Sequence, residues 1–293
     1  MRVDEFPKPG GKVSASEYVI TNGGQSGNAA VAIARLGGRV KYAGALGGPH
    51  DEVAANIVAG FAKEGIDYSG AVRVDGAKSS VSIVMLDATG EKMIATRRDS
   101  GLSGVAPTNA DALVANVDAV LIDNRYENFA NPVCAAAKKR DIPRVIDLDR
   151  VTKLDDPLLK GCTHIVSSAD AIRGTTGEED LGAALKVLGP HLDGFLAATD
   201  GPDGVYWLDN GQVRHMPAFK VEVVDSLGAG DTFHGAFTYR LAEGGDVVDA
   251  MRFASAAAAI KCTRFGGLTG APNRAEVEAF LKKHAAPALE AVG

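Results

Sequence analysis

The hydrophobic residues in the second half of the chain fall into short runs, which are separated by longer segments with helical spacing. The short runs predict strands at 119–122, 144–146, 163–166 and 195–198, and the longer segments predict helices around 130–139 and 181–188. Such alternation is typical of a mostly parallel sheet with helices on both faces. We therefore predict a doubly wound α/β core.

The first third of the chain has a different pattern, made of extended pieces and turns. A turn-rich segment at 6–12 precedes apolar residues at 18–20. The runs 80–86 and 92–95 are joined through Asp87-Ala88-Thr89-Gly90, which suits a hairpin. We expect a small β-sheet lid formed by residues 1–22 and 70–98, over a core formed by residues 23–69 and 99–293.

The remaining elements are expected within the core. Ser26 can cap a helix that runs to Arg35 and stops at Gly37-Gly38. Asn210-Gly211 marks a hairpin between two short runs. The other predicted elements are a strand at 40–45 and helices at 51–63, 247–262 and 274–284.

Composition restricts the class of protein. The chain has 293 residues, 46% of them hydrophobic, which is enough for one large core and a small appendage. A net charge of -6 gives no basic stripe, so nucleic acid is not expected as a partner. No apolar run approaches the roughly 20 residues that span a bilayer, and we expect a cytoplasmic protein with no membrane partner. The three dispersed cysteines argue against a disulfide framework.

The segment from Asp225 to Phe237 carries the strongest chemical signal. A β-branched run at 221–224 predicts a strand before it, and a helical segment follows. Gly228 and Gly230 let the backbone curl so that amides point into one concavity at a helix start, which favours a bound phosphoryl group. Asp231 lies in the first helical turn, where the dipole favours its ionised form, and it can accept a hydroxyl proton. The alternative is that Asp231 only caps the helix, and the residues alone leave both open.

Two further turns have the chemistry of ligand sites. The stretch 22–30 contains Gly23, Gly24 and Asn28, whose amide can donate to and accept from sugar hydroxyls. It lacks the spacing of a dinucleotide site or a P-loop, and a tight helix–sheet contact is its alternative. Residues 199–204 follow a strand, and they suit either a nucleotide contact or a plain β-turn.

These stretches resemble the signatures of the ribokinase-like carbohydrate kinases, also called the phosphofructokinase-B family. Residues 225–231 resemble the C-terminal pattern Asp-Thr-x-Gly-Ala-Gly-Asp, with Ser226 in place of Thr, and residues 22–30 resemble the N-terminal signature. The two occur in the family's order, about two hundred residues apart. The resemblance implies an anion hole at Gly228, Ala229 and Gly230, a catalytic base at Asp231, and a sugar pocket lined by Gly23, Gly24 and Asn28.

The same resemblance implies ATP and Mg²⁺. ATP would be held by Thr199, Gly201 and Gly204, with Ala258 beside the adenine, and Asp225 with the loop at 265–267 would hold a monovalent cation such as K⁺. The family's metal-facing Asn-x-x-Glu is not kept at Ser168-Ala169-Asp170-Ala171. Asp147 and Asp149 are the other acidic candidates for the metal, and surface salt bridging is their alternative.

Two positively charged side chains are candidates for binding the substrate. Arg125 follows the strand ending at Asp123, at the edge where ligands of open parallel sheets bind, and Lys12 lies in the expected lid. Together they can grip an anion at the far end of a sugar, and the pattern is similar to the branch containing 6-deoxy-6-sulfofructose kinase. Thr96 lies near the position where that branch has an Asn. Solvated surface cations are the alternative.

We therefore expect an ATP-dependent sugar kinase that phosphorylates a primary hydroxyl of a ketose or sugar phosphate, and that forms a homodimer through the lid. The alternatives are a non-catalytic sugar or nucleotide binder and an adenosine- or vitamin-type kinase. Members of the family begin with a buried strand and a Gly-x-x-x-x-Asp element, whereas this chain begins at the lid. Roughly fifteen to twenty residues are expected to be missing upstream of residue 1.

Overall fold

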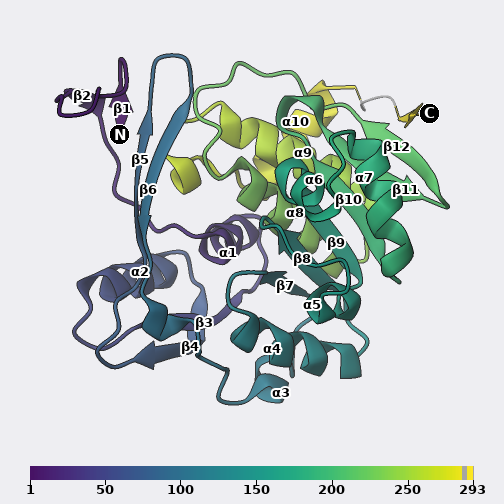
Figure 1. The fold of residues 1–293 in the computed structure, drawn as a ribbon, viewed down its shortest axis with the longest axis horizontal. Helices are drawn as coiled ribbons and strands as arrows, with labels where there is room; N and C mark the ends of the chain where they lie inside the picture. Colours follow the sequence, from purple (N-terminus) through teal and green to yellow (C-terminus); the bar gives the residue numbers. More distant parts are fainter. Residues whose placement is uncertain (286–288, 293) are drawn as a thin grey trace.

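The computed structural model describes residues 1–285 and 289–292, and it places three β-sheets among the helices (Figure 1). The strands are β1 (Arg2–Val3), β2 (Ala15–Glu17), β3 (Lys41–Gly47), β4 (Asp67–Val74), β5 (Val81–Leu86), β6 (Lys92–Arg97), β7 (Val120–Asp123), β8 (Arg144–Leu148), β9 (His164–Ser168), β10 (Phe195–Thr199), β11 (Val205–Asp209), β12 (Gln212–Met216) and β13 (Glu290–Val292). The α-helices are α1 (Gln25–Arg35), α2 (Glu52–Lys63), α3 (Ala110–Leu113), α4 (Glu127–Lys139), α5 (Pro157–Gly161), α6 (Ala169–Thr176), α7 (Leu181–Leu188), α8 (Ala229–Ala242), α9 (Val247–Cys262) and α10 (Arg274–Lys283).

The largest sheet has seven strands in the order β13-β12-β11-β10-β9-β8-β7. Strands β7 to β10 are parallel, with Ile122 opposite Ile146 and Ile146 opposite Ile165. The edge formed by β11 to β13 is antiparallel, because Asn210 and Gly211 turn the chain directly back with φ of 49° and 79°. The predicted doubly wound α/β fold is confirmed.

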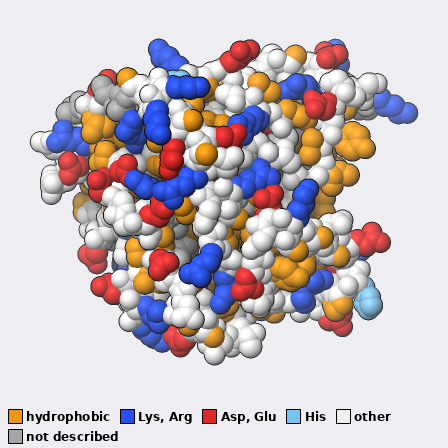
Figure 2. All heavy atoms as spheres, turned by 180° about the vertical axis from the view of Figure 1, so that it is seen from behind, with side chains coloured by type: hydrophobic (Ala, Val, Ile, Leu, Met, Phe, Trp, Pro, Cys, Tyr) orange, Lys and Arg blue, Asp and Glu red, His pale blue; other side chains and the backbone are white. Residues whose placement is uncertain are grey.

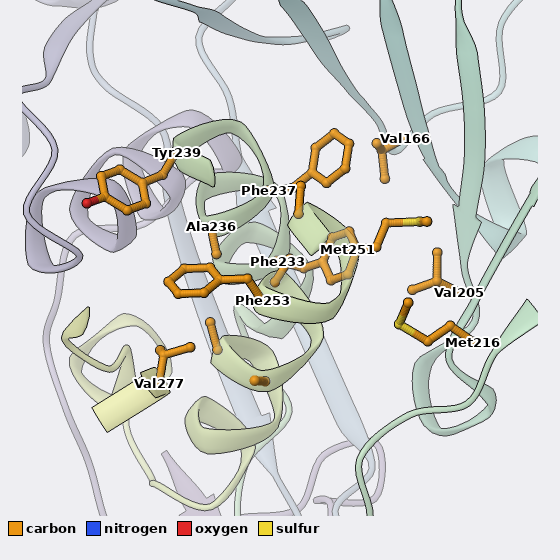
Figure 3. Close-up of a cluster of buried hydrophobic side chains, with 14 of the residues drawn as sticks. Val166, Val205, Met216, Phe233, Ala236, Phe237, Tyr239, Met251, Phe253 and Val277 are labelled. Atoms are coloured by element: carbon orange, nitrogen blue, oxygen red, sulfur yellow. The ribbon is translucent and has the colours of Figure 1, made fainter. Parts of the chain in front are cut away.

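Helices cover both faces of this sheet. Val145 and Val166 belong to a core cluster with α8 and α9, whereas Ile146 and Ile165, their neighbours along the strands, belong to a second cluster with α5, α6 and α7. This is the two-residue period of a strand with both faces buried. Figure 3 shows the first cluster, in which Phe233 and Phe237 of α8 and Met251 of α9 lie on the side of the sheet residues Val166, Val205 and Met216.

The lid is a separate four-stranded sheet with the order β2-β1-β5-β6 (Figure 1). Its β5–β6 hairpin turns at residues 87–90, as predicted. The lid boundary expected at residue 70 differs from this arrangement, because β4 pairs in parallel with β3 and the lid sheet resumes only at Val81. The physical reason is the α2 crossover, which brings β4 back beside β3.

Two local predictions were wrong. Residues 221–224 form no strand, and Val223 and Val224 are exposed; the Val224 amide donates instead to the Cys262 carbonyl at the end of α9 (2.8 Å). The β-branched run had no strand partner to pair with. Ser26 does not cap α1, whose N-cap is Gly24 with no side-chain cap hydrogen bond; the Ser26 hydroxyl donates to Asp123.

The surface carries charges of both signs. On the face shown in Figure 2, Lys and Arg side chains are interspersed with Asp and Glu. None of the described helices combines the length and the apolar character that a membrane crossing requires.

Helices α1 and α8 approach closely at Gly235. A Cβ at this position would lie 2.8 Å from the Ala29 carbonyl oxygen and 3.1 Å from the Ala32 Cβ. The missing side chain lets α1 lie against the first turns of α8. The contact therefore sets the distance between Asn28 on α1 and Asp231 on α8.

We expect Gly235→Ala to lower the free energy of unfolding by roughly 1–3 kcal/mol, because the new methyl group meets backbone atoms that cannot move aside. Intrinsic helix propensity alone would favour Ala over Gly by about 1 kcal/mol. A net loss of stability would therefore come from the close contact between α1 and α8. Urea denaturation measures the change. Gly104→Ala is the control, because a Cβ there has no neighbour within 4 Å. A Gly235→Ala protein as stable as wild type would contradict the packing argument.

Candidate active site

The turn before α8 exposes backbone amides to a ligand. Gly228 adopts a left-handed conformation (φ 79°) as the N-cap, and no side chain caps the helix. The first intrahelical amide bond is that of Thr232, which donates to the Gly228 carbonyl (3.0 Å). The amides of Gly230 and Asp231 therefore have no acceptor within the helix, and they sit at its positive end. Free amides at the positive end of a helix suit a bound anion.

Asp231 contacts Asn28 beside this turn. The Asn28 Nδ2 donates to the Asp231 Oδ2 (2.5 Å), and a Cβ on Gly228 would lie 3.8 Å from both atoms. Burial raises the pKa of the Asp231 carboxyl, although the Asn28 hydrogen bond, His234 and Arg125 lower it. The helix dipole alone predicted the opposite direction, because the sequence does not show how deeply the side chain is enclosed. A raised pKa makes the carboxylate a better proton acceptor.

Asn28 also keeps an acceptor free. Its Oδ1 is buried and has no hydrogen-bond partner in the described part of the chain. Buried polar atoms are nearly always paired, so an orphan atom beside a cavity marks the place of a ligand donor. A sugar hydroxyl supplies such a donor.

A network of polar side chains continues from this pair along the carboxyl ends of β7 and β8. Arg125 donates to Asp149 (3.0 Å) and to Gln25, and Gln25 donates to Asp147 (3.2 Å). Burial raises the pKa of Asp147 to about 7, and the nearby negative charges of Asp231, Asp149 and Asp123 act in the same direction. The sheet edge thus gathers acids that the sequence scatters over more than a hundred residues.

The His234 ring lies between the anion turn and β9. Its Nδ1 lies 2.7 Å from the Gly230 carbonyl oxygen, and its Nε2 lies 3.1 Å from the Val166 carbonyl oxygen and 3.5 Å from the Asp147 Oδ1. Both ring nitrogens therefore face oxygen atoms, one within α8 and one on β9. The sequence offered one signal for this role, since positions 230 and 234 are one helical turn apart.

The three acidic residues considered for a metal do not form one cluster. No group of three or more His, Cys, Asp and Glu side chains that could hold a metal ion occurs among residues 1–285 and 289–292. Asp147 is engaged by Gln25 and His234, and Asp225 accepts from the Leu227, Gly266 and Gly267 amides. Asp149 is the most exposed of the three, and it pairs with Arg125.

A cavity of about 1400 Å³ opens beside the Asn28–Asp231 pair and extends between β3 and β7. Of the predicted residues, Gly23, Gly24, Asn28, Arg125, Asp225 and Asp231 line it. Lys12 is exposed and does not line the cavity, whereas Arg98, the residue after β6, does. Arg98 was missed because the sequence does not show which of the neighbouring residues Arg97 and Arg98 lies toward the cavity.

The predicted nucleotide residues lie outside this cavity. Thr199 ends β10, and Gly201 and Gly204 follow it with positive φ. A Cβ on Gly204 would lie 2.2 Å from the Met216 carbonyl oxygen, so that glycine is also required by the neighbouring backbone. Ala258 is partly buried on α9 beside the core.

The fold, the amide-lined turn before α8 and the adjoining cavity, whose lining is mostly apolar, are those of a phosphotransferase that acts on small molecules. Its sequence matches the model of the pfkB family carbohydrate kinases over residues 1–274, and the chain belongs to this family. It is therefore an ATP-dependent carbohydrate kinase.

The most similar relatives compared with it are ribokinases. The Bacillus subtilis ribokinase is 30% identical over 281 residues, which cover 95% of this chain and 94% of the relative. A provisionally named ribokinase from Agrobacterium tumefaciens superposes with a TM-score of 0.91 at 37% identity, over 96% of this chain and 93% of that one. The Arabidopsis thaliana ribokinase with ribose and ATP has the same fold, with a TM-score of 0.83 at 23% identity over 96% and 94% of the two chains.

We expect Asn28→Leu to move the acid limb of the kcat/KM profile to higher pH. The hydrogen bond from Asn28 lowers the pKa of Asp231, and Leu removes it while still excluding water. The base then loses its charge at a higher pH. Asn22→Leu is the control, because Asn22 lines the same cavity but donates to the Ile57 carbonyl. An unmoved limb in Asn28→Leu would show that another group controls the profile.

Proposed function

We propose that this kinase transfers the γ-phosphoryl group of ATP to a primary hydroxyl of a small sugar, with Asp231 as the base. The observation that carries the proposal is the Asn28–Asp231 pair, with an unpaired Asn28 Oδ1 beside it, at the start of α8. Asn28 would hold one sugar hydroxyl while Asp231 accepts the proton of the attacking one. The amides at Gly228 and Gly230 would receive the transferring phosphoryl group, whereas the Ala229 amide of the predicted anion hole donates to the Ser226 carbonyl (3.2 Å).

The nucleotide belongs on the β10 side of this turn. Thr199, Gly201 and Gly204 would hold its phosphates and Ala258 would lie beside the adenine. Mg²⁺ would arrive with the ATP, because it keeps several waters and needs only one or two carboxylates from a protein. Asp149 fits that role better than Asp147 or Asp225, because it is the most exposed of the three and only its Oδ2 has a partner, Arg125, among the described residues. The ion would offset charge on the transferring group.

The lid would exclude water during transfer. Tyr18, Val19 and Ile20 line the cavity, and Ile20 is 87% exposed. Closing these apolar side chains over a sugar would bury them and protect ATP from hydrolysis. The lid strands also expose Val81, Ile83, Met93 and Ile94, and we include in the proposal a homodimer joined through this sheet.

The acceptor that best fits Arg125 is a sugar with an anionic group at its far end. We propose 6-deoxy-6-sulfofructose, or another ketose or sugar phosphate with an anion in that place. The Arg125 guanidinium lines the cavity and is held by Asp149 and Gln25, so its orientation is fixed before substrate enters. A fixed planar fork suits the oxygens of a sulfonate or phosphate.

We expect Asp231→Asn to lower kcat by about 10²–10⁴-fold, because the amide cannot accept the proton of the attacking hydroxyl. ATP affinity, measured by calorimetry, should stay within about threefold of wild type, since Asp231 is not assigned a nucleotide contact. Asp155→Asn, at an exposed residue, is the control. Equal turnover in Asp231→Asn and wild type would refute the assignment of the base.

The acceptor is tested with a panel of ribose, fructose, fructose phosphates and 6-deoxy-6-sulfofructose. We expect Arg125→Gln to lower kcat/KM about 10²-fold for the preferred anionic sugar and to leave a neutral ketose nearly unchanged. Arg125→Lys keeps the charge but not the planar guanidinium, so its kcat/KM for the anionic sugar should lie between the values of wild type and Arg125→Gln. A preference for a neutral sugar, or an equal loss on both kinds, would overturn the anionic acceptor and leave the kinase assignment intact.

A further inference from the structure

Lys261 is the only fully buried lysine in the described part of the chain. Its side chain, near the end of α9, has 0% exposure. The ammonium donates to the Asp225 backbone carbonyl (2.5 Å) and lies 3.6 Å from the Asp225 Oδ1. A buried lysine needs a partner, and this one is paired with the first residue of the 225–231 turn.

The Asp225 carboxylate is fully engaged by donors from the protein. The Leu227 amide donates to Oδ1 (2.8 Å), and the Gly266 and Gly267 amides donate to Oδ2 (3.0 and 2.9 Å). With the ammonium beside Oδ1, these groups match the roughly four acceptor positions of a carboxylate. Hydrogen bonding to these amides and the charge of Lys261 lower the pKa of Asp225 against the effect of burial.

The neighbouring carbonyls are also occupied. The Cys262 carbonyl accepts from the Val224 and Asp225 amides (2.8 and 3.1 Å), and the Gly266 carbonyl accepts from the amide and hydroxyl of Thr269 (3.2 and 3.0 Å). A dehydrated K⁺ ion needs several oxygens turned toward one point. Here the 266–267 loop turns its amides, not its carbonyls, toward Asp225, and these residues do not fit the K⁺ ion expected at this place.

We infer that the Lys261 ammonium is a built-in monovalent cation, which occupies the position at Asp225 that a free K⁺ ion would otherwise take. An ammonium group is a compact positive charge with three donors, so it can bind a carbonyl and a carboxylate together. It joins the end of α9 to the turn that opens α8, and through Asp225 it fixes the Leu227 amide next to Gly228. Because the charge is covalently attached, it cannot be lost by dilution or exchanged for Na⁺.

If Lys261 takes the place of a free cation, the stability and turnover of the protein should not depend on which monovalent cation is in the buffer. The protein is dialysed into tetramethylammonium chloride and then measured in that salt, NaCl or KCl at one ionic strength. We expect wild-type Tm to be the same in all three salts and wild-type kcat to vary by less than about twofold. A wild-type Tm or kcat that rises with K⁺ over tetramethylammonium would overturn the inference.

The variant Lys261→Met removes the charge and keeps an unbranched side chain of similar length. In tetramethylammonium we expect its Tm to fall by roughly 5–10 °C, because Asp225 loses its buried partner. We expect kcat to fall about tenfold or more as the turn loses its support, and K⁺ to restore part of the Tm. Lys186→Met, at an exposed lysine, is the control. Equal Tm and kcat in Lys261→Met and Lys186→Met would overturn the inference.

The two readouts separate this inference from the proposed function, on which only the kcat measurement depends. If no sugar in the panel is phosphorylated, the wild-type Tm in the three salts still decides whether a free cation binds. If Lys261→Met does not fold, the wild-type series decides alone.

Discussion

The hydrogen bonds collected by Asp225 hold the active-site turn in place. Three amides from two separate loops, at 227 and 266–267, meet one buried carboxylate, and Lys261 supplies the opposite charge. Removing one partner from such a buried pair typically costs about 3–5 kcal/mol, because the other charge is left uncompensated. The segment at 221–224 has no strand partners of its own, so this cluster and the Cys262 carbonyl fix the path of the chain into the turn.

The chemistry of the site follows from burial as much as from charge. Near a helix start, the dipole alone would keep Asp231 acidic. Enclosure between α1, α8 and the sheet edge raises its pKa instead. Burial also raises the pKa of Asp147, and three nearby carboxylates act in the same direction. The His234 ring lies between the Gly230 carbonyl and Asp147, so it connects the anion turn to this acidic cluster.

The sequence was sufficient where local and tertiary preferences agree. The α9 boundaries and the Asn210-Gly211 hairpin were predicted from helix formers and turn chemistry, and the glycine turn before α8 was recognised by its spacing. It was insufficient where tertiary contacts decide. Residues 221–224 look like a strand, and Lys261 looks like a surface cation favoured at a helix C-terminus, yet that side chain is buried. Ser26 looks like a cap but donates to Asp123, which is 97 residues further along the chain.

The site must bind a highly charged nucleotide although Asp123, Asp147, Asp149 and Asp231 gather near it. Positively charged side chains and the helix dipole offset the negative charge of these carboxylates. Arg125 pairs with Asp149, the His234 ring faces Asp147, and the amides at the start of α8 point outward with a positive end. Lys261 neutralises Asp225 directly behind the turn, so that no uncompensated negative charge lies there. Among the described residues, Asp231 forms no ion pair and accepts instead from the neutral Asn28 amide, an arrangement that suits the base proposed for it, because no cation competes there for the proton-accepting oxygens.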